Sequence, residues 1–244
     1  MSQVFIIEGE ISAGKSELVR AFTNGLINKG YNAIPVLEPV DEWVKSGILK
    51  QFYNDPQRWG YAFQTFVYIT RIQAIRNAVE ANLDVQAVFV LERSPITDEI
   101  FMELQRGIVS DVEMEMYEQW RRNFIPLLPL DLAQATVLYL KPSLDTCMRR
   151  LHLRNRNGEV SDENQTAEKS SGVTFQYQKR LREAHEALLE GLHEDQFPTL
   201  VAREPPFKRS SVVIIPPALA ELNFRDKGSE QDFVLDEIFK LLNL

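Results

Sequence analysis

The stretch Gly9-Glu10-Ile11-Ser12-Ala13-Gly14-Lys15-Ser16 fits the pattern G-x-x-x-x-G-K-[ST], in which successive backbone N–H groups form a cradle for phosphates. Residues 4–7 before it are a short apolar run typical of a strand, and residues 17–28 after it have the pattern of a helix. This order of strand, turn and helix points a helix N-terminus at an anion. A simple turn rich in glycine and serine would fit the same letters. With these neighbours we interpret the stretch as a phosphate-binding loop, in which Lys15 reaches the terminal phosphates and the Ser16 hydroxyl binds Mg²⁺.

Length and charge limit what the protein can be. A chain of 244 residues is long enough for one α/β domain with a full core and too short for two large domains. We therefore expect residues 1–244 to form a single domain. The net charge of −8 argues against a nucleic-acid-binding surface, which requires a basic face. Any partner that carries phosphates must be bound by a local cluster of basic residues.

The single cysteine, Cys147, excludes an internal disulfide and a cysteine metal site, so we expect a small buried thiol. No apolar run approaches the length of a membrane span, and we expect no membrane contact. The first apolar run follows Met1-Ser2-Gln3 directly, and no signal peptide is visible. We expect an intracellular protein of the cytoplasm. Mitochondria are the alternative, although no transit peptide is visible.

Apolar runs typical of strands alternate with helical patterns along the chain. The expected strands are residues 4–7, 33–37, 86–91, 136–140 and 211–215. The expected helices include residues 17–28, 58–82, 111–127, 175–193 and 232–242, and one more follows the fourth strand. Such alternation favours a five-stranded parallel sheet with helices on both faces, a three-layer α/β fold.

Two carboxylates are expected at the ends of strands. Glu38 follows residues 33–37, and Glu92 with Arg93 follows residues 86–91. In open α/β sheets, ligands bind at the carboxyl ends of the strands. An acidic residue at such a place helps to hold Mg²⁺ in many phosphate-loop proteins. A surface ion pair between Glu92 and Arg93 is the alternative interpretation.

A basic cluster follows the fourth strand, with four arginines inside eight residues: Arg149, Arg150, Arg154 and Arg156. Arg150 and Arg154 are one helical turn apart and can converge on one anion. Guanidinium groups bind phosphate oxygens in pairs and stay charged, so this density suits a transferring phosphoryl group. A solvated helix end is the alternative. Residues 157–172 are polar without apolar periodicity, and we expect a mobile loop there.

The long helix expected at residues 58–82 carries Gln64 and Arg71, which are seven residues apart and share a face. Spacing alone favours two solvated side chains, whereas the aromatic and apolar residues around them favour burial. That apolar stripe is Phe63, Phe66, Val67, Ile69, Ala74 and Val79. The helix at 111–127 has a second stripe, which indicates core or a subunit interface: Met114, Tyr117, Trp120, Phe124 and Leu127.

These features together match the parts that phosphoryl transfer requires: a phosphate cradle with its lysine, carboxylates for Mg²⁺ and for a base, and cations for the transferring group. The base-reading motif N-K-x-D and the motif D-x-x-G of switch GTPases are both missing. A kinase for a small molecule is therefore favoured over a motor or a switch.

Several separated motifs resemble the deoxynucleoside kinase family, of the deoxycytidine and deoxyguanosine kinase type. The resemblance runs from residue 4 to about residue 189 and implies a phosphate-loop kinase fold, ATP as donor, Mg²⁺, a nucleoside 5′-hydroxyl as acceptor and a homodimer formed through the long helices. The motifs are residues 9–16, Glu38-Pro39-Val40 with Trp43, Phe63-Gln64-Thr65, Glu92-Arg93-Ser94 with Asp98, and Arg150-x-x-x-Arg154-x-Arg156.

The resemblance also implies roles for single residues. Glu92 would be the general base and Arg93 would steady the reacting oxygen, while Glu38 would lie beside the 5′-hydroxyl and the metal and is the alternative base. For the acceptor, the implied contacts are Tyr53 and Glu159 to the sugar 3′-hydroxyl, Gln64 to the base, and Trp43, Phe63 and Phe101 as apolar walls. Arg150, Arg154 and Arg156 would form a lid over the donor phosphates, within a lid and insert of about residues 150–172.

Arg71 and Asp98 match the charged pair that relatives preferring deoxycytidine or purine deoxynucleosides place over the base. The resemblance therefore implies that deoxyadenosine, deoxyguanosine or deoxycytidine is preferred over thymidine. Two rivals remain. A nucleoside monophosphate kinase would need a further cation near Glu38, where the chain has Asp41 and Glu42. A nucleotide-binding regulatory module would bind without turnover.

Overall fold

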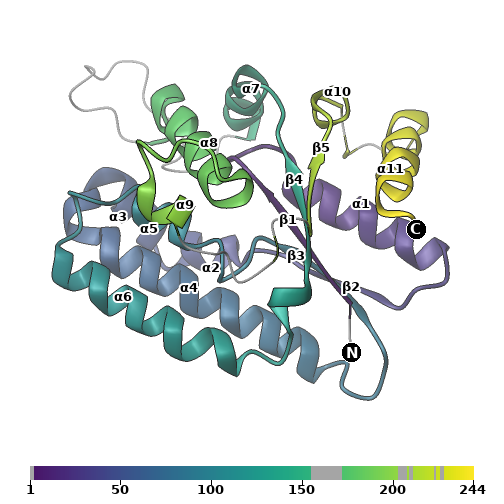
Figure 1. The fold of residues 1–244 in the computed structure, drawn as a ribbon, viewed down its shortest axis with the longest axis horizontal. Helices are drawn as coiled ribbons and strands as arrows, with labels where there is room; N and C mark the ends of the chain where they lie inside the picture. Colours follow the sequence, from purple (N-terminus) through teal and green to yellow (C-terminus); the bar gives the residue numbers. More distant parts are fainter. Residues whose placement is uncertain (1–2, 155–171, 203–207, 209–210, 223, 226–227) are drawn as a thin grey trace.

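The computed structural model describes residues 3–154, 172–202, 208, 211–222, 224–225 and 228–244. Its centre is a five-stranded parallel sheet with the strand order β2-β3-β1-β4-β5 (Figure 1). The strands are β1 (Gln3–Gly9), β2 (Ala33–Val36), β3 (Val88–Glu92), β4 (Thr136–Leu140) and β5 (Val212–Ile215). The predicted parallel sheet is confirmed, and each strand boundary lies within two residues of its prediction.

The long helices also agree with the sequence pattern, with differences at their ends. The helix expected at 111–127 ends at Phe124, and the 3-10 turn that follows contains Pro126. The helix expected at 175–193 ends at Glu190, because Gly191 adopts a left-handed conformation with φ 73°. The long helices are α1 (Lys15–Asn28), α4 (Pro56–Glu80), α6 (Asp111–Phe124), α7 (Leu144–Arg154), α8 (Phe175–Glu190) and α11 (Ser229–Leu242).

Shorter helical segments connect these elements and are too short to show a helical period in the sequence. They are α2 (Val40–Lys45), α3 (Ile48–Asn54), α5 (Glu99–Glu103), the 3-10 turns Ile125–Leu127 and Leu132–Gln134, α9 (Pro198–Ala202) and α10 (Pro217–Ala220). Among the described helices, none has the length and apolar character needed to span a membrane.

Each face of the sheet is covered by helices, so the three-layer prediction is confirmed. Phe5 and Ile7 of β1 pack in one cluster with α1 and α11, while Val4 and Ile6 pack in another with α4. This alternation is that of a strand buried on both faces. Cys147 lies in the cluster with α1, fully buried, and burial raises the pKa of its thiol to about 12. The expected buried thiol is confirmed.

Two residues of the predicted apolar stripes are exposed. Ile69 of α4 is 44% exposed and Leu127 after α6 is 72% exposed. α4 and α6 lie side by side, away from α1 and α11 (Figure 1). They therefore keep a face that no other described element covers, and Ile69 is exposed although it belongs to the apolar stripe of α4.

Candidate active site

The phosphate-binding loop connects β1 to α1, and two of its glycines are required by its geometry. Gly9 has φ 151°, and a Cβ there would lie 2.4 Å from the Leu140 carbonyl oxygen of β4. Gly14 has φ 110°, in the region that favours glycine. Because α1 begins at Lys15, its N-terminal N–H groups lie at the carboxyl end of the sheet, where they can bind an anion.

Lys15 makes a hydrogen bond within this loop, and Ser16 joins the loop to β3. The Lys15 ammonium donates to the Glu10 carbonyl oxygen at 2.8 Å. Burial and the positive charge of Arg93 lower the pKa of Lys15 to about 8. The Ser16 hydroxyl donates to Glu92 Oε1 at 2.6 Å and so joins the loop to the end of β3.

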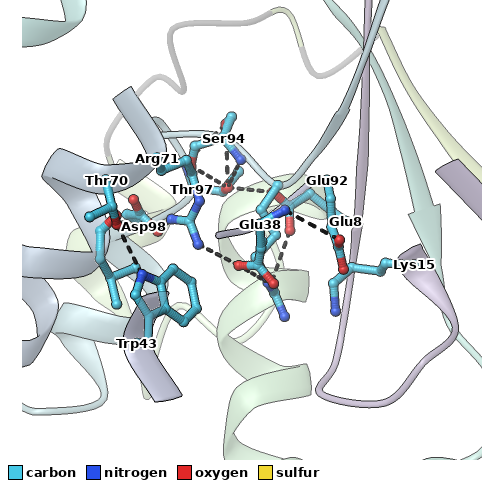
Figure 2. Close-up of polar contacts among 12 residues, drawn as sticks. Glu8, Lys15, Glu38, Trp43, Thr70, Arg71, Glu92, Ser94, Thr97 and Asp98 are labelled. Carbon is cyan, nitrogen blue, oxygen red and sulfur yellow. Dashed lines mark hydrogen bonds and ion pairs between the residues drawn. The ribbon is translucent and has the colours of Figure 1, made fainter. Parts of the chain in front are cut away.

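The carboxylates of Glu38 and Glu92 lie close together but differ in their environments (Figure 2). The Glu38 N–H donates to Glu92 Oε2 at 3.4 Å. Burial and the negative charge of Glu38 raise the pKa of Glu92. Burial also acts to raise the pKa of Glu38, but the guanidinium groups of Arg71 and Arg93 outweigh it and lower that pKa. Two neighbouring carboxylates whose pKa values move apart are suited to different roles.

Arg93 lies 3.4 Å from Glu38 and is held by a buried network. Its guanidinium donates to Glu8 Oε2 at 3.0 Å and to the Gly9 carbonyl oxygen at 2.7 Å, and it lies 3.1 Å from His185 Nε2. Thr97 donates to the other oxygen of Glu8. Both Glu92 and Arg93 are buried, so the alternative of a surface ion pair is wrong.

Sequence reasoning missed Glu8 and His185. The signal for Glu8 was a charged residue at the end of a strand otherwise buried on both faces, where an acidic side chain must have a partner. Burial acts to raise the pKa of Glu8. The His185 hydrogen bond and the positive charge of Arg93 outweigh it, and the net effect lowers this pKa to about 2.

Arg71 lies between Glu38 and the aromatic ring of Trp43. It pairs with both Glu38 and Asp98, and its guanidinium lies 5.9 Å from the Trp43 ring (Figure 2). Trp43 Nε1 donates to Thr70 Oγ1 at 2.9 Å. Gln64 and Arg71 are each 3% exposed, so the expectation of two solvated side chains, drawn from spacing alone, is wrong. Asp98 stands at the N-terminal end of α5, where its carboxylate pairs with Arg71 and makes no cap hydrogen bond.

One cleft at the carboxyl edge of the sheet brings most of the predicted residues together. Its lining includes predicted residues from both halves of the expected site: Ile11, Ser12, Lys15, Glu38, Trp43, Tyr53, Phe63, Gln64, Glu92, Arg93, Phe101 and Arg154. Apolar and aromatic residues that were not predicted complete the wall: Val40, Leu49, Phe52, Val67 and Tyr177. Arg156, Glu159 and the predicted mobile loop at 157–172 lie outside the described residues.

Arg150 lies elsewhere than expected. Its guanidinium donates to the carbonyl oxygens of Ala13 at 2.6 Å, Glu221 at 3.0 Å and Leu222 at 2.8 Å. These bonds hold the phosphate-binding loop against residues 220–222, in place of the expected convergence with Arg154 on an anion. Arg154 is exposed and lines the cleft.

The buried Glu8 allows a test of this network by pH. A carboxyl whose folded-state pKa falls from 4.5 to about 2 adds about 3 kcal/mol to the free energy of unfolding. That contribution is complete above pH 4.5 and is lost as the pH falls towards 2. We expect Glu8→Gln to lower stability by roughly this amount at pH 7, with a difference from wild type that shrinks below pH 5.

Urea unfolding followed by circular dichroism between pH 7 and pH 3 measures this difference. Glu80→Gln, which changes an exposed side chain of α4, is the matched control and should stay within about 0.5 kcal/mol of wild type. A loss in Glu8→Gln that does not change with pH would contradict an ionised Glu8.

Comparison with known proteins agrees with this geometry. The family model described as deoxynucleoside kinase matches residues 5–242. A probable deoxycytidine kinase of fowlpox virus is 32% identical over 197 residues, which cover 78% of this chain and 73% of the relative. Deoxycytidine kinase of Homo sapiens is 28% identical, over 75% of this chain and 74% of the relative. A mitochondrial deoxyguanosine kinase of Xenopus laevis is 26% identical, over 75% and 71%. The chain belongs to the deoxynucleoside kinase family and is an ATP-dependent phosphotransferase.

Proposed function

We propose that this protein transfers the γ-phosphoryl group of ATP to the 5′-hydroxyl of a deoxynucleoside and prefers deoxyadenosine, deoxyguanosine or deoxycytidine to thymidine. The single observation that carries the proposal is the shared cleft. One cavity is lined by Lys15 of the phosphate-binding loop and by Gln64 among aromatic walls, with Glu92 and Arg93 also in its lining. A donor site and an acceptor site that share one cavity can place the two reacting atoms in line.

On the donor side, residues 9–16 would bind the triphosphate through backbone N–H groups and Lys15. Mg²⁺ is bound in proteins by one or two carboxylates, with phosphate oxygens and water completing its coordination. Ser16 Oγ and Glu92 Oε1 lie 2.6 Å apart and fit this requirement, with Glu38 as the further carboxylate nearby. When bound, Mg²⁺ would neutralise negative charge on the phosphates.

On the acceptor side, Glu92 is our candidate for the general base that removes the proton from the 5′-hydroxyl. Before Mg²⁺ binds, the pKa of Glu92 is raised, whereas the negative charge of Glu38 is balanced by Arg71 and Arg93 and the pKa of Glu38 is lowered. Arg93 would donate to the reacting oxygen and the incoming phosphoryl group. Glu38 would remain ionised beside them, and it is the alternative base.

The deoxynucleoside itself would be recognised by side chains of α4 and its neighbours. Gln64 would make paired hydrogen bonds to the base, between walls formed by Trp43, Phe63 and Phe101. Tyr53 would bind the sugar 3′-hydroxyl, together with Glu159. Arg71 and Asp98, both buried and paired, would limit which bases can bind with an edge facing this pair. A site that recognises its substrate by hydrogen bonds rejects analogues more strongly than a site that recognises it by size alone.

Removal of the proposed base tests the reaction. We expect Glu92→Gln to lower kcat by about 10²- to 10⁴-fold, because an amide cannot accept the proton. The affinity for ATP measured without Mg²⁺ should stay within about fivefold of wild type, because the loop and Lys15 are unchanged and the proposed metal contact of Glu92 is then not used. Steady-state kinetics with a binding titration measures both, and Glu237→Gln on the exposed side of α11 is the control.

The variants also separate the alternatives. If Glu92→Gln keeps its kcat while Glu38→Gln loses it, the base is Glu38.

A substrate panel tests the proposed acceptor. We expect kcat/KM to be higher for deoxyadenosine, deoxyguanosine or deoxycytidine than for thymidine, because Arg71 and Asp98 occupy the base edge with charged groups. The assay is phosphorylation of the four deoxynucleosides and of their monophosphates, each at the same ATP concentration. Highest efficiency with thymidine would contradict the proposed preference, and turnover of a monophosphate would favour the rival monophosphate kinase.

We also propose that the protein is a homodimer formed through α4 and α6. A groove on these helices is lined in part by Ile69, Ile72 and Phe124, and Ile69 is well exposed. Contiguous exposed apolar surface of this kind often marks an interface. We expect Ile69→Glu to give monomers in sedimentation velocity, while Leu83→Glu, an exposed apolar position beyond the end of α4, should leave the dimer intact. A monomeric wild type would overturn the proposal.

A further inference from the structure

Helix α8 binds directly to the start of the phosphate-binding loop. The Ile11 N–H donates to Gln178 Oε1 at 3.2 Å, and Gln178 Nε2 donates to the Ile11 carbonyl oxygen at 2.7 Å. Arg182 Nε donates to Glu10 Oε1 at 2.9 Å. Gln178 and Arg182 are one helical turn apart, so the same face of α8 makes all three contacts.

Glu10 is a residue of the loop that we propose binds the donor phosphates. The side chain is fully buried, and its Oε2 has no hydrogen-bond partner among the described residues. Its Oε1 accepts from Arg182 and also from Tyr139 at 3.0 Å. Burial acts to raise the pKa of Glu10, but the hydrogen bond and the charge of Arg182 outweigh it and lower that pKa, so the group is ionised at neutral pH.

An ionised carboxylate at this place has an electrostatic consequence. Like charges repel more strongly where water is excluded, so an unbalanced Glu10 would oppose the binding of a triphosphate. Arg182 supplies the balancing charge from outside the loop. Its guanidinium also donates to the Pro142 carbonyl oxygen between β4 and α7, and therefore fixes two of the connections at the carboxyl edge of the sheet.

The hydrogen bonds of Gln178 fix a peptide group of the loop. The Ile11 N–H donates to Gln178 and the Ala13 N–H donates to the Glu10 carbonyl oxygen, so we expect other N–H groups of the loop to bind the phosphates. Ser12, the next residue, has φ 63°, a left-handed conformation that is uncommon for a serine. Gln178 thus holds Ile11 in place directly before this turn.

We infer that Arg182 and Gln178 are positioning residues for the donor: Arg182 balances the charge of Glu10, and Gln178 fixes the start of the phosphate-binding loop. This inference rests on the proposed donor site at residues 9–16. It assigns to α8 a part in ATP binding that does not require either side chain to touch the nucleotide.

If Arg182 balances the charge of Glu10, its loss should change the KM for ATP much more than the KM for the deoxynucleoside. We expect Arg182→Gln to raise the KM for ATP by about tenfold or more, because Glu10 is left unbalanced next to the triphosphate. The KM for the deoxynucleoside should change by less than about threefold. The double variant Glu10→Gln/Arg182→Gln should bring the KM for ATP back to within about threefold of wild type, because the unbalanced charge is then absent.

Steady-state kinetics with each substrate varied in turn, together with thermal melting, measures these effects. Arg180→Gln changes an exposed arginine of the same helix and should leave both KM values unchanged. An unchanged KM for ATP in Arg182→Gln, or a double variant no better than the single one, would overturn the inference. If Arg182→Gln does not fold, Gln178→Leu decides in the same assay, where a selective rise in the KM for ATP supports the inference and an unchanged KM overturns it.

The variant Lys15→Ala distinguishes a failure of the proposed donor site from a failure of the positioning role alone. Lys15→Ala should raise the KM for ATP whether or not Arg182 has a positioning role. If Lys15→Ala has no effect on ATP, the proposed donor site is wrong. If Lys15→Ala weakens ATP binding but Arg182→Gln does not, only the positioning role is wrong.

Discussion

The guanidinium of Arg93 connects three strands and a helix around the cleft. It extends from the end of β3 to Glu8 and Gly9 of β1, to Glu38 after β2, and to His185 of α8. A buried cation is stable only when such partners surround it. The backbone of Arg93 is left-handed, with φ 62°, a conformation that is uncommon for a residue with a long side chain. The relative positions of the strand ends, and so of the site, depend on this one group.

Three carboxylates at this edge of the sheet are each paired with an arginine, whereas Glu92 is not paired with one in the part of the chain that the structure describes. Glu8 pairs with Arg93, Glu10 with Arg182, and Glu38 with Arg71, and the pKa of each of these carboxyls is lowered. Glu92 accepts its side-chain hydrogen bond from the uncharged Ser16 hydroxyl, and its pKa is raised. Among the described residues, arginine thus balances the charge of Glu8, Glu10 and Glu38, while Glu92 at the end of β3 has the raised pKa that the proposed base requires.

The sheet, the phosphate-binding loop and the strand-end carboxylates could be predicted from the sequence. Each depends on a pattern of neighbours within a few residues. Partners that are distant in sequence could not be predicted in this way. Glu8 and Arg93 are separated by 85 residues, and Glu10 and Arg182 by 172. Gln64 and Arg71 show the same limit, since their spacing places them on one face of α4 but does not reveal that aromatic side chains of α2 and α3 cover that face.

The position of Cys147 has a practical consequence for spectroscopy. It is the one cysteine of the sequence, it lies in the core beneath α1, and burial keeps its thiol protonated at neutral pH. Maleimide and nitroxide reagents attack exposed thiolates, so the native chain carries no competing target for them. A cysteine introduced on the surface would then be the one labelled position, and distances across the cleft could be followed during turnover without first replacing a native residue.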